Sequence, residues 1–177
     1  MAEHPWSVPM RREEVPETGR RVELVADETV RDSVAKEAGV VGVERLSAVF
    51  DVTRLGHDGL RATGRVRATV RQTCVVSLEP MSTDLDEAID VAFAPPNAIA
   101  TGTELDFEPA PASGEPPEPL VNGGIDLGAL ATEFLILGID PYPRKPDVTF
   151  EPPAVPDAGE NPFAALAALK NASKVKD

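Results

Sequence analysis

The stretch ERLSAVFDVTRLGHDGLRATGRVRATVRQTC, residues Glu44–Cys74, decides the fold of this 177-residue chain. Apolar and polar residues alternate on both sides of Gly56–Gly59, which is the pattern of strands that bury one face. The segment between the two runs, GHDG, is rich in residues that favour turns. The stretch therefore predicts an antiparallel β-hairpin, and the buried face of its first strand would carry Leu46, Ala48, Phe50 and Val52.

The second strand of this hairpin places opposite kinds of side chain on its two faces. The inward face would carry Leu60, Ala62, Val66, Ala68 and Val70. The outward face would carry Arg61, Arg65, Arg67 and Arg71, interleaved with threonines. Residues two apart on a strand are separated by roughly 6.6 Å, close to two phosphate steps of roughly 3.4 Å on one strand of a duplex. These four arginines are therefore candidates for contacts to a nucleic-acid backbone.

A second interpretation of the arginine face is purely structural. Arginines on a strand pair with carboxylates on neighbouring strands, and this chain has 30 Asp and Glu residues. The strand also carries no aromatic side chain on which a base could stack, which disfavours a reader of single-stranded bases. Phosphate contact and pairing within the sheet both stay open at this point.

The residues around the hairpin predict further strands and helices. Arg20–Val25 alternates as a strand, and a helix follows from an Asp27 N-cap to Gly39. Leu85–Phe93 alternates as another strand, and an apolar helix begins at Asp126 and is ended by prolines. This order predicts an α+β fold, an antiparallel sheet or partly open barrel with two to three flanking helices and a long acidic, Pro-rich loop.

Composition along the chain predicts one folded domain with extensions. The predicted parts are an extended N-terminal segment (1–19), a single α+β domain (20–143) with a flexible acidic loop (94–121), a Pro-rich connector (144–160), and a C-terminal helix with a basic tail (161–177).

The C-terminal helix is a candidate for partner binding. Asn161 is an N-cap followed by proline, and Lys170 lies at the end of the helix as a further candidate. Phe163, Leu166 and Leu169 lie between them at helical spacing. This narrow apolar stripe would dock on the chain's own domain or insert into the groove of a partner protein.

Charge is spread unevenly over the chain. The net charge of −13 opposes non-specific binding to nucleic acid. Residues 1–80 hold 12 Lys/Arg against 13 Asp/Glu, whereas residues 81–160 hold 2 against 16. The second half therefore suits a basic protein, and a locally basic strand in the first half still permits contact with RNA.

The chemistry-bearing residues predict a cytoplasmic protein without catalytic activity, cofactor or metal. Cys74 is the single cysteine, which excludes an intramolecular disulfide, and no export signal or segment long enough to cross a membrane is visible. Cys74 falls on the inward face of its strand, where a buried thiol is more frequent than a reactive one. His4 and His57 fall in a tail and a turn, so no nucleophile has a positioned base. A hydrolase would need a deep pocket with convergent polar groups.

An ordered set of motifs resembles the YceD-like family. These are GRVRATVRQTCVVSLEP (Gly64–Pro80), an acidic gap containing EPL (Glu118–Leu120), IDLGALATEFLILGIDPYPR (Ile125–Arg144) and NPFAALAALK (Asn161–Lys170). The resemblance implies a non-enzymatic ribosome-biogenesis factor that supports accumulation of large-subunit (23S) ribosomal RNA, with ribosomal RNA or a large-subunit ribosomal protein as its partner. Many relatives carry Cys-x-x-Cys before the LEP motif, whereas this chain has Cys74 and Ser77, so metal binding does not carry over. The alternative is an adaptor that acts through its C-terminal helix without touching RNA.

Overall fold

The computed structural model describes residues 4–100 and 116–152, and its contacts divide the chain into units of residues 1–145 and 146–177. All the helices and strands of the described residues belong to the first unit. In chain order they are β1 (Pro9–Arg11), a 3-10 turn η1 (Arg12–Glu14), β2 (Arg20–Val25), α1 (Glu28–Ala38), β3 (Gly42–Leu55), β4 (Gly59–Thr73), β5 (Pro80–Ala94), α2 (Pro96–Ala100), β6 (Glu118–Pro119), β7 (Gly124–Asp126) and α3 (Leu127–Gly138).

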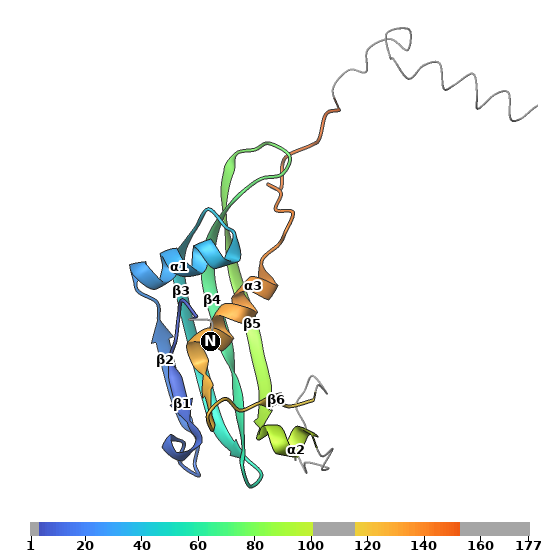
Figure 1. The fold of residues 1–177 in the computed structure, drawn as a ribbon. Helices are drawn as coiled ribbons and strands as arrows, with labels where there is room; N and C mark the ends of the chain where they lie inside the picture. The colour runs from blue at the N-terminus through green and yellow to red at the C-terminus, as the bar shows by residue number, and fades with distance from the viewer. Residues whose placement is uncertain (1–3, 101–115, 153–177) are drawn as a thin grey trace, which may run out of the picture. The chain divides into compact units, whose positions relative to one another are not determined.

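A five-stranded sheet of order β2-β3-β4-β5-β6 forms the body of the domain (Figure 1). Its first four strands are antiparallel, and the short β6 pairs with β5 in parallel. The predicted hairpin is confirmed as β3 and β4, in a register that places Phe50 opposite Gly64. Glycine is needed there because a Cβ on residue 64 would lie 2.1 Å from the Val49 carbonyl oxygen. The sheet does not close, so of the two predicted forms the open sheet is the one observed.

One face of the sheet, which we call the inner face, holds the core. The inward residues predicted for β3 and β4 are all buried, with Phe50, Val52, Leu60 and Val70 each 0% exposed. Helices α1 and α3 lie across this face (Figure 1), and their Val34 and Leu135 belong to the same apolar cluster. The opposite face, which we call the outer face, has no helix over it among the described residues.

Helix α1 begins and ends where its capping residues predict. The Asp27 side chain accepts a hydrogen bond of 2.8 Å from the Val30 N–H, which satisfies one N–H of the first turn. Gly39 follows the last turn with φ +67°, a left-handed conformation that glycine adopts without strain.

The N-terminal segment, predicted as extended, also contributes to the core. Trp6, Met10 and Val15 are buried, and β1 pairs with β7 across more than a hundred residues, with Pro9 opposite Asp126. The start of α3 lies close to this segment, since a Cβ on Gly128 would lie 2.5 Å from the Trp6 carbonyl oxygen. Glycine at the second position of α3 therefore permits the N-terminal segment to cross the helix.

Both ends of the predicted acidic loop 94–121 are described, while residues 101–115 lie outside the described part. Helix α2 occupies one end, and β6 at the other end leads to Leu120, which is 6% exposed. The Leu120 N–H donates to the Ala94 carbonyl over 2.9 Å, so the chain returns to the sheet where it left it.

Candidate functional site

The four candidate arginines all project from the outer face, but they do not form one cluster. They spread along β4 over ten residues, which at about 3.3 Å per residue separates Arg61 from Arg71 by about 33 Å. Arg61 lies at one end, Arg65 and Arg67 in the middle and Arg71 at the other end. Three local environments therefore replace the single row that the sequence suggests.

Each of the four arginines is paired with a carboxylate of its own chain, as the structural interpretation of this face expects. Arg61 makes two hydrogen bonds of 2.8 Å to Asp90, and the two side chains are 16% and 25% exposed. Hydrogen bonding to Asp90, partly opposed by burial, raises the pKa of Arg61. At the other end, Arg71 lies 3.8 Å from Glu44. Arg61 is thus the most firmly held of the four.

Arg65 and Arg67 share one carboxylate in the middle of the strand. Arg65 contacts Asp86 Oδ1 at 2.7 Å, and Arg67 contacts Asp86 Oδ2 at 3.3 Å. The hydrogen bond from Arg65 is the main cause that holds the pKa of Asp86 below its usual value. Two guanidinium groups against one carboxylate leave an excess positive charge at this point, and both arginine side chains are more than half exposed.

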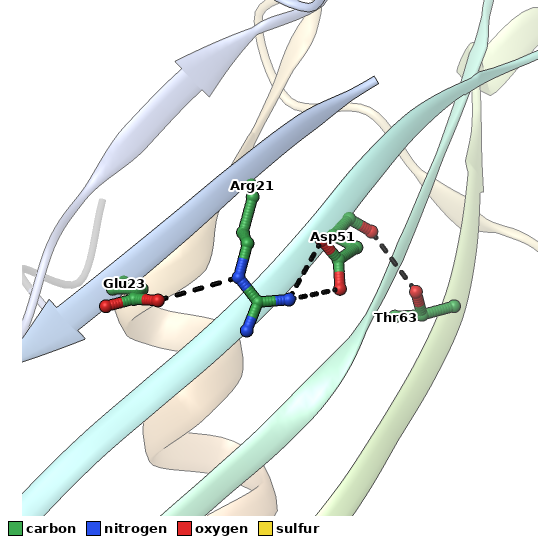
Figure 2. A network of polar contacts seen from close by, with 4 residues as sticks. All are labelled: Arg21, Glu23, Asp51 and Thr63. Atoms are coloured by element: carbon green, nitrogen blue, oxygen red, sulfur yellow. Dashed lines mark hydrogen bonds and ion pairs between the residues drawn. The ribbon is translucent and has the colours of Figure 1, made fainter. Parts of the chain in front are cut away.

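Two further arginines, which the sequence did not single out, lie on the same face. Arg21 of β2 contacts Asp51 of β3 at 3.2 Å and Glu23 at 3.5 Å, and the Asp51 carbonyl accepts a hydrogen bond from Thr63 on β4 (Figure 2). Arg45 contacts Asp84 at 3.3 Å. The alternation of Arg20–Val25 could have identified Arg21 from the sequence. It places Val22 and Leu24 on the inner face and therefore Arg21 on the outer face.

A shallow depression of about 310 Å³ lies on this face between β2, β3 and β4. Its polar lining is formed by Arg21, Ser47, Asp51, Arg65 and Arg67. Three guanidinium groups therefore surround this hollow, together with the Asp51 carboxylate that pairs with Arg21.

Cys74 begins the turn between β4 and β5 and is fully buried, as its inward position predicts. Its sulfur accepts hydrogen bonds from the Ser77 N–H at 3.4 Å and the Lys145 N–H at 3.5 Å. The Ser77 side chain, followed by these backbone N–H groups, lowers the pKa of Cys74 to about 6. The thiol therefore connects the turn to the segment after α3. Lys145 of that segment also contacts the turn through a 2.7 Å ion pair with Glu79.

The remaining chemistry-bearing residues form no further site in the described ranges. His57 lies in the hairpin turn with a 96% exposed side chain, beside Asp58. Within residues 4–100 and 116–152, no group of three His, Cys, Asp or Glu side chains is placed to hold a metal ion. Of the helices in the same ranges, none combines the length and apolar character that crossing a bilayer requires.

The partner-binding candidates Phe163, Leu166, Leu169 and Lys170 lie outside the described residues. Docking on the domain and insertion into a partner's groove both stay predictions.

Comparison with known proteins identifies the family of this chain. Searches of curated proteins and of solved structures found no significant match to it. A family model described as "Large ribosomal RNA subunit accumulation protein YceD" matches residues 62–170, which include β4 from Ala62 onward, β5 and α3 but not Arg61. The matched residues make up more than half of the chain. The chain therefore belongs to the YceD family, whose name associates it with accumulation of the large ribosomal RNA.

Proposed function

We propose that this protein supports accumulation of large-subunit ribosomal RNA as a non-enzymatic factor that binds RNA through its outer sheet face. The observation that carries the proposal is the pair Arg65 and Arg67, which share the single carboxylate of Asp86 at the rim of the shallow depression. Arg21 supplies a third guanidinium on the opposite rim.

The ion pairs of this face are compatible with RNA binding because they are exposed. Exposed pairs contribute little to stability, about 0–1 kcal/mol at the median, so a phosphate can replace a carboxylate at low cost. Arg67, with a side chain 67% exposed, is the easiest of the three to redirect. Arg61 is held by a half-buried pair, and we assign it a role in positioning the strand instead of contacting RNA.

The proposed mode of binding is contact with the RNA backbone. The outer face of β4 presents arginines and threonines without an aromatic side chain, so stacking of bases has no platform there. Recognition would then depend on the shape and phosphate spacing of the RNA. This fits a protein whose net charge of −13 limits adhesion to nucleic acid elsewhere on its surface.

The test is the double substitution Arg65→Glu/Arg67→Glu, with binding to large-subunit ribosomal RNA fragments measured by fluorescence anisotropy over a range of salt. We expect at least a tenfold loss of affinity and a decrease of about 2 in the salt slope, because two phosphate contacts are removed. Cells that carry this variant as their single copy should have less large-subunit ribosomal RNA.

The matched control is Arg20→Glu/Lys36→Glu, which changes net charge equally with substitutions outside the rim of the depression. An equal loss of RNA affinity in both double variants would show that total charge alone governs binding. It would contradict the proposal that the outer face binds RNA. RNase-resistant recovery of a single ribosomal protein from cells would instead favour a protein partner.

A further inference from the structure

The last long strand of the sheet, β5, has an uncovered edge. It pairs with β4 from Pro80 to Phe93, whereas β6 pairs with Phe93 and Ala94 at its far end. In the part of the chain that the structure describes, no strand lies beside residues 81–88 on the side away from β4 (Figure 1). Such an edge is a template on which another strand can pair.

Two hydrogen bonds show which backbone groups of β5 point to this edge. The Glu79 carbonyl accepts from the Cys74 N–H at 2.9 Å, toward β4, and the Ala94 carbonyl accepts from the Leu120 N–H at 2.9 Å, away from β4. Backbone groups alternate between the two sides of a strand, and the β4–β5 register is regular. The even-numbered Ser82, Asp84, Asp86 and Ala88 therefore direct their N–H and C=O groups outward, with the Asp86 carbonyl also contacted by Arg65 at 3.3 Å.

The edge lacks the common devices that prevent pairing, except for negative charge. Residues 81–88 contain no proline, no lysine and no bulge. Carboxylates instead flank the edge on both faces, with Asp84 and Asp86 on the outer face and Glu87 on the inner face. The arginines that pair with Asp84 and Asp86 come from β3 and β4, one or two strand spacings of about 4.8 Å further in.

This charge pattern selects the kind of strand that can be added. A second copy of β5 would bring like charges together, which is unfavourable for directly opposed residues. A strand with lysines or arginines would place opposite charges beside Glu87 on the inner face. On the outer face it would share Asp84 and Asp86 with the arginines that already contact them. We propose that the β5 edge binds an extended, lysine- and arginine-rich segment of another protein, which adds to the sheet as a strand.

This inference goes beyond RNA binding and does not depend on it. It has one consequence for the outer face, because basic side chains of the added strand would compete for Asp86. Arg65 and Arg67 would then be freed for an anionic ligand beside the bound segment.

The experiment uses the full chain and two ten-residue peptides, one alternating lysine with threonine and one alternating glutamate with threonine. The variant Ala88→Pro removes an edge N–H that β4 does not use, and Ala88→Thr keeps that N–H at the same exposed position. We expect the lysine peptide to bind the wild type and Ala88→Thr with equal affinity. Its affinity for Ala88→Pro should be at least tenfold lower. The glutamate peptide should bind none of the three proteins.

Hydrogen exchange of the unaltered protein gives a second readout that does not depend on the folding of a variant. Added lysine peptide should slow exchange of the amides of Ser82, Asp84, Asp86 and Ala88. Equal binding to Ala88→Pro and Ala88→Thr would show charge attraction without strand addition and overturn the inference. Protection of these amides before peptide is added would also overturn the inference. Protection that does not depend on protein concentration would show that the chain itself covers the edge. Protection that increases with protein concentration would show that a second copy covers it.

Discussion

The inner and outer faces of the sheet are built from the same long strands by opposite means. On the inner face, apolar side chains of β3 and β4 are buried under α1 and α3. On the outer face, arginines and carboxylates pair in water, and two of the exposed arginines share one partner. Apolar burial fixes a fold, whereas exposed ion pairs are weak and exchangeable. The inner face therefore provides most of the stability of the sheet, whereas the exposed ion pairs of the outer face contribute little to it.

The largest effect is expected from two adjacent residues that point to opposite faces. Phe50→Ala should lower the free energy of unfolding by about 3–5 kcal/mol, because it removes a fully buried ring. Val49→Ala should cost about 1 kcal/mol or less, since Val49 lies on the outer face. Urea unfolding followed by circular dichroism measures both. Similar losses for the two variants would contradict the division of roles between the faces.

The next largest effect is expected at Asp126, which attaches the N-terminal segment to the helix that covers the inner face. Its carboxylate accepts hydrogen bonds from Ser7 Oγ at 2.6 Å, Val8 N–H at 2.8 Å, Gly128 N–H at 3.0 Å and Ala129 N–H at 3.1 Å. Asp126→Ala should cost about 2–3 kcal/mol in urea unfolding, more than the roughly 1 kcal/mol expected for the simpler cap lost in Asp27→Ala.

The same residue gives this effect a pH dependence. Burial raises the pKa of Asp126, but hydrogen bonds from the Ser7 side chain and from backbone N–H groups outweigh it, so the pKa is lower in the folded protein. Stability from the ionised group is then present above the unfolded pKa of about 3.9 and is lost as pH falls through the folded pKa. The difference in stability between wild type and Asp126→Ala should therefore shrink below about pH 4. A constant difference down to about pH 2 would refute the assignment.

The smallest effects are expected among the outer-face arginines, and they should differ by burial. Arg61→Ala should cost about 1–2 kcal/mol, because it leaves the half-buried carboxylate of Asp90 without its two shortest contacts to arginine. Arg67→Ala should change thermal stability little, because its side chain is mostly exposed. Equal destabilisation by the two changes would mean that the outer face contributes to stability as a unit.

Local patterns in the sequence predicted the local parts of this fold. Alternation gave the faces of β3 and β4, and Asp27, Gly39 and Asp126 marked helix boundaries because capping depends on near neighbours. The pairing of β1 with β7 was missed because no local pattern connects Pro9 with Asp126. The partners of the arginines were missed for a related reason. Which carboxylate faces Arg65 or Arg67 depends on the register of β5, which is set by the turn between Cys74 and Glu79.

The pairing of β1 with β7 also governs the order in which a newly made chain can fold. A ribosome completes β3 and β4 long before it adds residues 124–138, which pair with the N-terminal segment and cover the inner face. The hairpin contacts are local, whereas the pairing of the N-terminal segment with β7 spans more than a hundred residues and can form only after residues 124–126 have been made. During synthesis the part of the apolar face that α3 covers therefore stays exposed until α3 emerges, whereas α1 is made before β3 and β4.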